Sequence, residues 1–308
     1  MQMPFQLTIL GSSSAMPTSK RYPTAQVLNV LGRFFLIDCG EGTQHQLRKN
    51  KIGFGRLNHI LISHLHGDHF FGLIGFISTQ ILLGRTNDLH IFAHSELQRY
   101  IQFQIDFLKI QDLGFRLVFH PLNFKKEQVI LDDEKLTITS FPLNHRIQCC
   151  GFLFEEKEKE ANIKKGQLKK YQIPIRDIKN IKAGADFVTE EGEIISNKKL
   201  VIPPQKPRTY AFCSDTAYHE KIIPIIQDVD LLYHEATFAD SEQALAKTTF
   251  HSTGKEAAQI AKKANAGKLL IGHFSARYKE PQVILDEARS IFPETYAISE
   301  DEVYEVTR

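Results

Sequence analysis

The chain contains 308 residues, 42% of them hydrophobic and 24% charged, a composition typical of a globular protein large enough to bury a core without disulfides. No apolar run is long enough to span a bilayer, no signal peptide is apparent, and the four cysteines show no CxxC spacing. These features argue against a membrane-spanning, secreted or disulfide-rich protein and predict a cytoplasmic one. The net charge of only +2 means that any affinity for nucleic acid must come from local patches.

The first half of the chain is predicted to alternate short strands with helices. Strands are expected at residues 5–10, 27–30, 34–37, 60–63, 89–92, 116–119, 136–141 and 151–154. Gly32 is placed at a hairpin turn between two of them. A buried helix is expected at residues 70–83, and a second, capped by Ser95, runs to about Leu108.

The composition changes abruptly at Glu155, where a highly charged segment begins and continues to Lys182. Within residues 163–182 there are seven basic side chains against one acidic side chain. A charge run of this kind is most often a solvated helix-turn insertion. The alternative, which is a functional hypothesis, is an arm that binds phosphates. This segment alone does not decide between them.

Globular character returns after Arg208. Strands are predicted at residues 210–214, 231–233 and 268–272, and a helix capped by Ser252 or Thr253 is predicted to run to Ala266.

A cluster of metal-ligand side chains follows the predicted strand at 60–63. His64 and His66 are two residues apart on an extended backbone, so they can bind one ion from the same side. Gly67 permits a sharp turn, which directs Asp68 and His69 toward a second position. A single histidine is usually structural, but four ligand side chains within six residues indicate a metal site.

Three further ligand candidates, His145, Asp215 and His273, each lie shortly after a predicted strand. Strand ends converge on one rim of a sheet, which is where α/β proteins bind ligands. Seven ligands imply two ions, and the many imidazoles favour zinc, with manganese or iron as alternatives. Such a pair of ions hydrolyses phosphodiesters. We found no GxGxxG or Walker-type loop and expect no nucleotide cofactor.

Several motifs resemble the ribonuclease Z family of the metallo-β-lactamase superfamily. The histidine cluster continues into Phe-Phe-Gly-Leu-Ile-Gly at residues 70–75, and residues 38–44 read Asp-Cys-Gly-Glu-Gly-Thr-Gln. The segment 10–18 with Arg21, the sequence His-Glu-Ala-Thr at 234–237 and the sequence His-Ser-Thr at 251–253 are also similar to this family. The resemblance implies a four-layer αββα sandwich and removal of the 3′ trailer from precursor tRNA, leaving a 3′ hydroxyl.

The resemblance also implies a role for each site residue. His64, His66 and His145 would hold a first zinc, Asp68, His69 and His273 a second, and Asp215 would bridge both. Asp68 would act as general base. His251, oriented and kept protonated by Glu235, would donate a proton to the leaving 3′ oxygen. Without the family pattern, His251 and Glu235 would be read as a helix-capping loop and a polar strand end.

The charged segment takes its meaning from the same resemblance. Family members carry an inserted, flexible, protruding arm here, which binds the tRNA elbow in a homodimer. Residues 155–200 are therefore expected to form this arm within a single domain of residues 1–308. Candidate phosphate contacts are Lys164, Lys165, Lys169, Lys170, Arg176, Lys206 and Arg208. The family's Gly-Pro pair is absent, since residues 173–176 read Ile-Pro-Ile-Arg.

Two alternatives to precursor-tRNA cleavage follow from the same residues. The first is another two-metal hydrolase of this fold, such as a lactonase or a small-molecule phosphodiesterase. The second is an RNA-binding module that has lost its metals. Glu235, His251 and the basic segment argue against the first, and the complete ligand set argues against the second.

Overall fold

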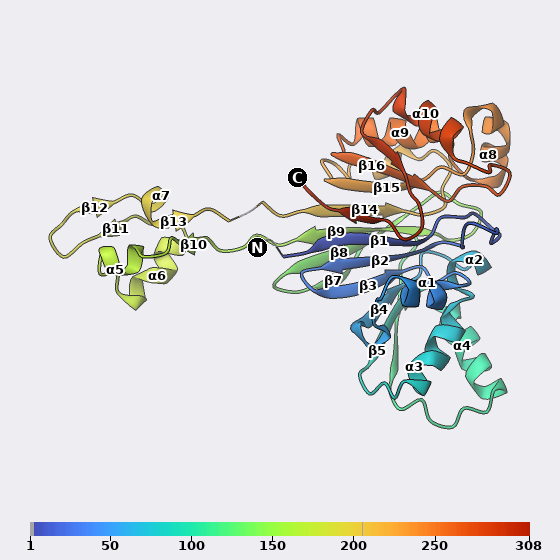
Figure 1. Cartoon of the computed structure of the whole chain (residues 1–308), viewed down its shortest axis with the longest axis horizontal. Helices are drawn as coiled ribbons and strands as arrows, with labels where there is room; N and C mark the ends of the chain where they lie inside the picture. The colour runs from blue at the N-terminus through green and yellow to red at the C-terminus, as the bar shows by residue number, and fades with distance from the viewer. Residues whose placement is uncertain (1–2, 205) are drawn as a thin grey trace. The chain divides into compact units, whose positions relative to one another are not determined.

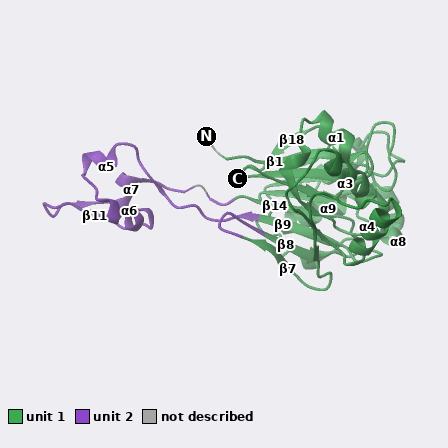
Figure 2. Ribbon diagram, turned by 90° about the horizontal axis from the view of Figure 1, so that it is seen from below, with its two compact units in different colours: residues 1–132, 138–154, 208–308 green, residues 133–137, 155–207 purple. Residues whose placement is uncertain are grey.

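A computed structural model of the chain describes residues 3–204 and 206–308. Residue 205, within the segment 203–208 expected to lie near RNA, is therefore outside the described residues, as are residues 1 and 2. The chain forms two compact units, coloured separately in Figure 2. The first consists of residues 1–132, 138–154 and 208–308, and the second of residues 133–137 and 155–207.

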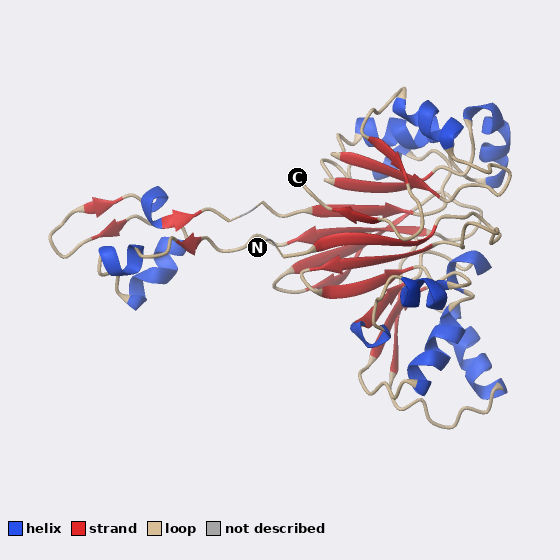
Figure 3. Cartoon of the chain, viewed as in Figure 1, coloured by secondary structure: helices blue, strands red, loops and turns tan. Residues whose placement is uncertain are grey.

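The first unit is built on two seven-stranded sheets (Figures 1 and 3). The neighbouring strands of the first sheet are, in order, β18 (Val303–Glu305), β1 (Phe5–Gly11), β2 (Ala25–Val30), β3 (Arg33–Ile37), β4 (Leu57–Leu61), β5 (Leu89–Ala93) and β6 (Leu117–Pro121). Pairing is antiparallel from β18 to β3 and parallel from β3 to β6. The parallel strand β3 has four consecutive buried residues, as expected of a strand covered on both faces.

The second sheet packs against the first. Its strands are, in order, β17 (Thr295–Ala297), β16 (Lys268–Gly272), β15 (Leu231–Glu235), β14 (Thr209–Cys213), β9 (Cys150–Glu156), β8 (Leu136–Pro142) and β7 (Gln128–Asp132). The Tyr210 hydroxyl of β14 donates a hydrogen bond of 2.6 Å to Gln26 of β2. The rings of Phe154 and Phe35 meet edge to face, 5.6 Å apart. These contacts join the inner faces of the two sheets.

Helices cover the outer faces of both sheets, which confirms the predicted four-layer αββα sandwich (Figure 1). The elements on the side of the first sheet are α1 (Thr43–Lys49), η1 (Phe54–Arg56), α2 (Gly67–Phe70), α3 (Leu73–Leu82) and α4 (Glu96–Phe107). Those on the side of the second sheet are η2 (Glu220–Ile222), η3 (Asp240–Glu242), α8 (Gln243–Thr249), α9 (Gly254–Lys263) and α10 (Gln282–Arg289). No helix of the described residues is long and apolar enough to cross a membrane.

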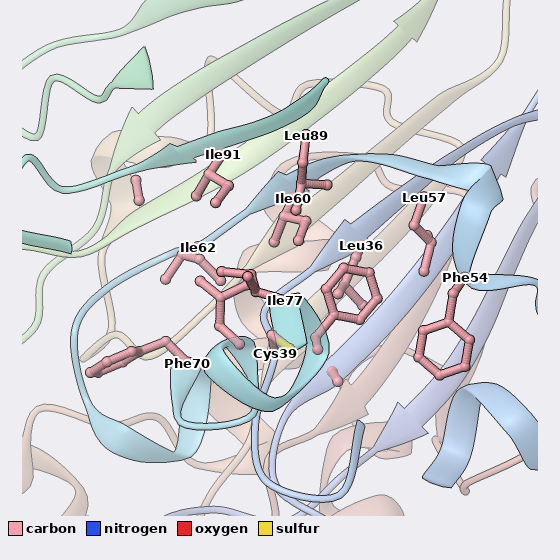
Figure 4. Close-up of a cluster of buried hydrophobic side chains, with 14 of the residues drawn as sticks. Leu36, Cys39, Phe54, Leu57, Ile60, Ile62, Phe70, Ile77, Leu89 and Ile91 are labelled. Carbon is pink, nitrogen blue, oxygen red and sulfur yellow. The ribbon is translucent and has the colours of Figure 1, made fainter. Parts of the chain in front are cut away.

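A hydrophobic cluster fixes α2 and α3 to the first sheet (Figure 4). Ile60, Leu89 and Ile91 of the sheet lie in one buried cluster with Phe70 and Ile77 of these helices. All five side chains are less than one-tenth exposed. Because α2 begins within the histidine cluster, this packing also determines where the metal-ligand side chains lie.

Two of the predicted elements that differ from the structure lie beside the histidine cluster. The helix predicted at 70–83 is divided into α2 and α3, because the Gly72 amide donates to the Cys39 carbonyl at 2.9 Å and not to a carbonyl of the preceding helical turn. The strand predicted at 60–63 runs from Leu57 to Leu61 instead, because the backbone of Leu57 and His59 already pairs with β3.

Helix capping is also partly as predicted. Ser95 precedes α4 but its side chain makes no capping hydrogen bond. Thr253, one of the two candidates for the later helix, forms a capping box with Glu256 at the start of α9.

The second unit has a small hydrophobic core of its own. Its elements are β10 (Asn162–Ile163), α5 (Gln167–Lys170), α6 (Ile175–Lys182), β11 (Phe187–Val188), β12 (Ile194–Ile195), α7 (Asn197–Leu200) and β13 (Val201–Ile202). Strand β10 pairs with β13, and β11 pairs with β12. Ile173, Ile181, Phe187 and Leu200 are buried together. The unit ends at Pro207, beyond the boundary expected at residue 200.

Replacing Ile77 should destabilise the protein in proportion to the volume removed. Ile77 is fully buried in the cluster of Figure 4. We expect Ile77→Val to lower the free energy of unfolding by about 0.5–1.5 kcal/mol and Ile77→Ala by about 2–5 kcal/mol. Denaturant unfolding measures both values, and equal effects of the two substitutions would contradict the packing described here.

Candidate metal centre

The site lies where strands of both sheets end. In the second sheet, β14, β15 and β16 are parallel and in register, with Cys213 beside His234 and His234 beside Ile271. Asp215 and His273 follow the ends of β14 and β16, and Glu235 is the last residue of β15. Parallel strands end on the same edge of a sheet, so these three polar side chains are brought to one rim.

Four of the predicted ligands form a first group. His66 Nδ1 lies 3.0 Å from His64 Nε2 and 3.1 Å from His145 Nε2. The Oδ2 atom of Asp215 lies 3.5 Å from His64 Nε2 and 3.8 Å from His145 Nε2. One nitrogen of each imidazole and one carboxylate oxygen therefore face a common point.

The other three ligands form a second group around the other oxygen of Asp215. Its Oδ1 atom lies 3.2 Å from His273 Nε2 and 3.4 Å from His69 Nε2. Asp68 Oδ2 lies 3.4 Å from His69 Nε2 and 3.6 Å from His273 Nε2. The structure thus brings all seven predicted ligands together, with Asp215 between the two groups.

The spacing and chemistry of these atoms fit metal ions. Ligands about 2.0–2.1 Å from a tetrahedral ion lie roughly 3.3 Å from one another, close to the distances within both groups. His69 Nε2, His273 Nε2 and Asp215 Oδ1 are buried and have no hydrogen-bond partner among the described residues. Leaving three such atoms unpaired would cost about 1–3 kcal/mol each, and a shared cation removes that cost.

Residues outside the ligand set fix how the imidazoles present their nitrogens. The buried carboxylate of Asp38 accepts hydrogen bonds from His69 Nδ1 at 2.7 Å and from the Ser63 amide and hydroxyl at 2.7 and 2.8 Å. Because the Ser63 hydroxyl donates to Asp38, it accepts from His64 Nδ1 at 3.0 Å. Both histidines are left with Nε2 facing the metal position.

Two further imidazoles, His273 of the second group and His145 of the first, are oriented in the same way. Thr237 Oγ1 donates to Glu235 at 2.8 Å and accepts from His273 Nδ1 at 2.8 Å. His145 Nδ1 donates to the Phe250 carbonyl at 2.9 Å. No role was predicted from the sequence for Asp38, Thr237 or Phe250. Asp38 and Thr237 lie in the family motifs at 38–44 and 234–237, just after strands. Their place in these motifs is the sequence feature that could have indicated a role.

Three residues at this rim have a strained backbone. Asp38, Phe250 and His273 have φ values of 57°, 60° and 61°, in the left-handed region that side chains other than glycine rarely adopt. Such conformations persist where the surrounding contacts impose them, and they are common at functional sites.

Glu235 and His251 form a buried ion pair beside the ligands. Glu235 Oε1 accepts from His251 Nδ1 at 2.9 Å, and the same carboxylate accepts from the amides of Thr216, Thr237 and Ser252. Burial alone would lower the pKa of His251, but the charge and hydrogen bond of Glu235 raise this pKa to about 9. The imidazole is therefore protonated near neutral pH and has Nε2–H to donate.

A cavity of about 450 Å³ gives access to these groups. His66, His145, Asp215, His251 and His273 line it, together with Asp68. The metal-ligand set and the Glu235–His251 pair thus meet at one opening in the first unit.

The predicted RNA-binding side chains occupy different environments. In the second unit, Lys165, Lys169, Lys170 and Arg176 are exposed, and Lys164 donates from Nζ to the Lys198 carbonyl at 2.6 Å. Lys206 is exposed. In the first unit, Arg208 is only 4% exposed, and its guanidinium donates to the Met3 carbonyl at 2.9 Å. Because this guanidinium is buried in a structural contact, we do not retain it as a phosphate ligand.

The chain is similar to known proteins over nearly its whole length. Residues 5–161 match the family model described as Anti-Pycsar protein Apyc1. The chain is 52% identical over 291 residues to Ribonuclease Z of Phocaeicola vulgatus, covering 94% of each chain. It is 49% identical over 297 residues to Ribonuclease Z of Bacteroides thetaiotaomicron, covering 96% of this chain and 94% of that one.

Solved structures give the same result for the fold. The short form of human tRNase Z has a TM-score of 0.72 and 27% identity, covering 98% of this chain and 100% of that chain. The metallo-β-lactamase fold protein YhfI of Bacillus subtilis has a TM-score of 0.69 and 19% identity, covering 98% and 99% of the two chains. The second similarity concerns the fold alone.

Removing the carboxylate that orients His69 should weaken metal binding. We expect Asp38→Asn to lower the affinity for zinc about 10- to 100-fold, because an amide cannot accept from His69 and Ser63 as the carboxylate does. Competition with a chromogenic chelator measures this affinity. Asp106→Asn, at an exposed position on α4, is the matched control. Equal affinities of the two variants would contradict the assigned role.

Proposed function

Because this chain belongs to the ribonuclease Z family, and over residues 5–161 to that of the Anti-Pycsar protein Apyc1, we propose that it uses two zinc ions to remove the 3′ trailer from precursor tRNA. It is an endoribonuclease that hydrolyses a phosphodiester bond and leaves a 3′ hydroxyl on the tRNA. The observation that carries this proposal is the set of seven ligand side chains around Asp215, with the Glu235–His251 pair at the same cavity.

Zinc ions bound to this ligand set would polarise the phosphodiester and lower the pKa of the attacking water. His64, His66 and His145 would hold the first ion and Asp68, His69 and His273 the second, and Asp215 would supply a carboxylate oxygen to each. Imidazole-rich ligand sets favour zinc over magnesium.

Two side chains handle protons in the proposed reaction. Asp68, whose Oδ2 atom is held by the Ala15 amide at 2.8 Å, takes the proton of the attacking water as general base. His251 donates its Nε2 proton to the leaving 3′ oxygen and is oriented by Glu235 through Nδ1. Glu235 accepts hydrogen bonds from three backbone amides and from the Thr237 hydroxyl, which favour its ionised form. The negative charge of Glu235 in turn favours the protonated form of His251.

We further propose that the second unit binds tRNA. Lys165, Lys169, Lys170 and Arg176 are exposed on or beside α5 and α6, and Lys164 lies next to them. The small core of this unit fixes the helices, so the cations are presented by an ordered surface. Their spacing along the chain suits contact with successive phosphates.

A cytoplasmic homodimer completes the proposal. The four cysteines are free and buried, in keeping with a reducing compartment. Large apolar side chains are exposed on α3 and α4, among them Leu82 at 84%, Phe103 at 64% and Phe107 at 72%. Exposed apolar clusters of this kind mark protein interfaces, and a second copy of the chain is the proposed partner.

Cleavage of a 3′-extended precursor tRNA by the zinc-loaded protein tests the main proposal. The expected product ends just after the discriminator nucleotide, carries a 3′ hydroxyl, and is not formed in the presence of a chelator. His66→Ala should abolish the reaction. If protein with two bound metals left the precursor intact but hydrolysed a small phosphodiester, the function would belong to another hydrolase of this fold.

The role of His251 can be separated from metal binding. His251→Ala should lower kcat for precursor tRNA by about 10²- to 10⁴-fold, because the leaving oxygen loses its proton donor. Metal content and tRNA affinity should stay unchanged, since another residue set supplies the ligands. Steady-state kinetics and metal analysis measure both. His45→Ala, an exposed histidine on α1, is the control, and an equal kcat for the two variants would exclude the proposed acid.

The basic surface of the second unit gives an independent prediction. Simultaneous replacement of Lys164, Lys165, Lys169 and Lys170 by alanine should weaken tRNA binding and reduce its salt dependence, because up to four phosphate contacts are lost. Hydrolysis of bis(p-nitrophenyl) phosphate should remain normal.

The matched control is alanine at four exposed lysines of the first unit that do not line the cavity, namely Lys125, Lys126, Lys247 and Lys262. Both variants lose four positive charges, so a general charge effect would weaken binding equally. Equal binding by the two variants would disprove a specific role for the second unit.

A further inference from the structure

The cavity beside the metal centre is lined by two side chains that the reaction does not use. Phe71 lies immediately after α2 and is 49% exposed, although it is a large apolar side chain. Arg146 follows the ligand His145 directly and is also exposed. Both line the same cavity as the ligands and His251. An aromatic ring and a guanidinium at one opening are the groups that proteins use to bind single-stranded nucleic acid.

Contacts with Gly67 and Phe70 hold the ring of Phe71 in place. It lies so close to Gly67 that a Cβ on that glycine would be 2.1 Å from Phe71 Cε2. The ring of Phe70 meets it edge to face, with centroids 4.9 Å apart, and Phe70 in turn packs against Tyr100 at 5.3 Å. Phe70 belongs to the buried cluster of Figure 4. These contacts therefore fix the position of the exposed ring.

Arg146 is a cation without a protein partner. No hydrogen bond or ion pair of its guanidinium occurs within residues 3–204 and 206–308. Of the described residues that line the cavity, it is the only arginine or lysine. The preceding residue is fixed, because the His145 ring donates to the Phe250 carbonyl at 2.9 Å. The guanidinium is therefore free to bind an anion close to the metal centre.

We propose that Phe71 and Arg146 form a binding subsite for the first nucleotide of the trailer, with its base stacked on Phe71 and its following phosphate bound to Arg146. This subsite rests on the proposed function and specifies which part of the substrate the cavity mouth recognises. It takes any base, because stacking on an aromatic face depends little on base identity.

The assignment to the trailer follows from the position of His251. The ring of His251 lies 5.1 Å from that of His145 and 5.3 Å from that of His273, and it serves the leaving 3′ oxygen of the tRNA. Phe71 instead packs on Gly67, between His66 and Asp68. We therefore assign Phe71 to the nucleotide on the other side of the scissile phosphate from the leaving oxygen. That nucleotide is the first of the trailer.

Fluorescence of 2-aminopurine at the first trailer position tests the stacking without any cleavage. The labelled precursor carries a non-hydrolysable linkage at the cleavage position and is bound to zinc-loaded, full-length protein, with folding checked by circular dichroism. Emission from the complex should be lower with the unaltered protein and Phe71→Tyr than with Phe71→Ala. A label on the discriminator nucleotide should give no such difference, and a difference there alone would overturn the assignment to the trailer.

Cleavage kinetics provide the second test. Phe71→Ala, or an abasic first trailer nucleotide, should each lower kcat/KM roughly tenfold or more, and the combination should be no worse than either alone because both remove one contact. Arg146→Ala should lower kcat/KM and reduce the salt slope by about one phosphate contact, with Arg146→Lys intermediate. Tyr296→Ala and Lys126→Ala, at exposed positions away from this cavity, are the controls.

The outcomes separate the subsite from the function. If the unaltered protein cuts the intact precursor and the abasic precursor equally well, or if the two losses multiply, the subsite is wrong and the function stands. If the unaltered protein does not cut the intact precursor, the proposed function fails and the subsite fails with it.

Discussion

The carboxylate of Asp215 is the point around which the catalytic rim is organised. It is buried between two groups of imidazoles, and each of its oxygens faces a different group. Burial raises the cost of its charge, and the neighbouring His273 and His69 side chains lower its pKa well below the usual range. A buried anion of this kind requires cations on both sides. Strand ends from both sheets, and the loop after β4, meet where they can supply them.

The ligands could be predicted from the sequence because four of the seven lie in one short segment and the others end strands. The residues that orient them could not. Asp38 and Thr237 contact His69 and His273 across 31 and 36 residues of chain, and only the register of the sheets places them there. Helix α1 was not predicted, because Gly42 before it has a φ of 82° and no side chain caps its first turn.

In the charged segment, too, the burial of some side chains could not be predicted from the sequence. Its lysines predicted a solvated surface, and Lys165, Lys169 and Lys170 are exposed. Its few apolar residues, such as Ile173, Ile181 and Phe187, looked too sparse for a core, yet helix and hairpin geometry brings them together. Arg208 was read as a surface cation for the opposite reason, since its sequence neighbours are polar or proline. Its burial depends on β1, where Phe5 lies under its guanidinium.

The Thr237 hydroxyl has a single proton, and this has a consequence for how the site can evolve. It gives that proton to Glu235 and therefore receives one from His273. Glu235 thus sets the tautomer of a metal ligand as well as the charge of His251. Any change at Glu235 alters both at once, so selection cannot adjust the acid and the second metal position separately through this residue. The protonation of His251 and the orientation of His273 therefore depend on the same carboxylate.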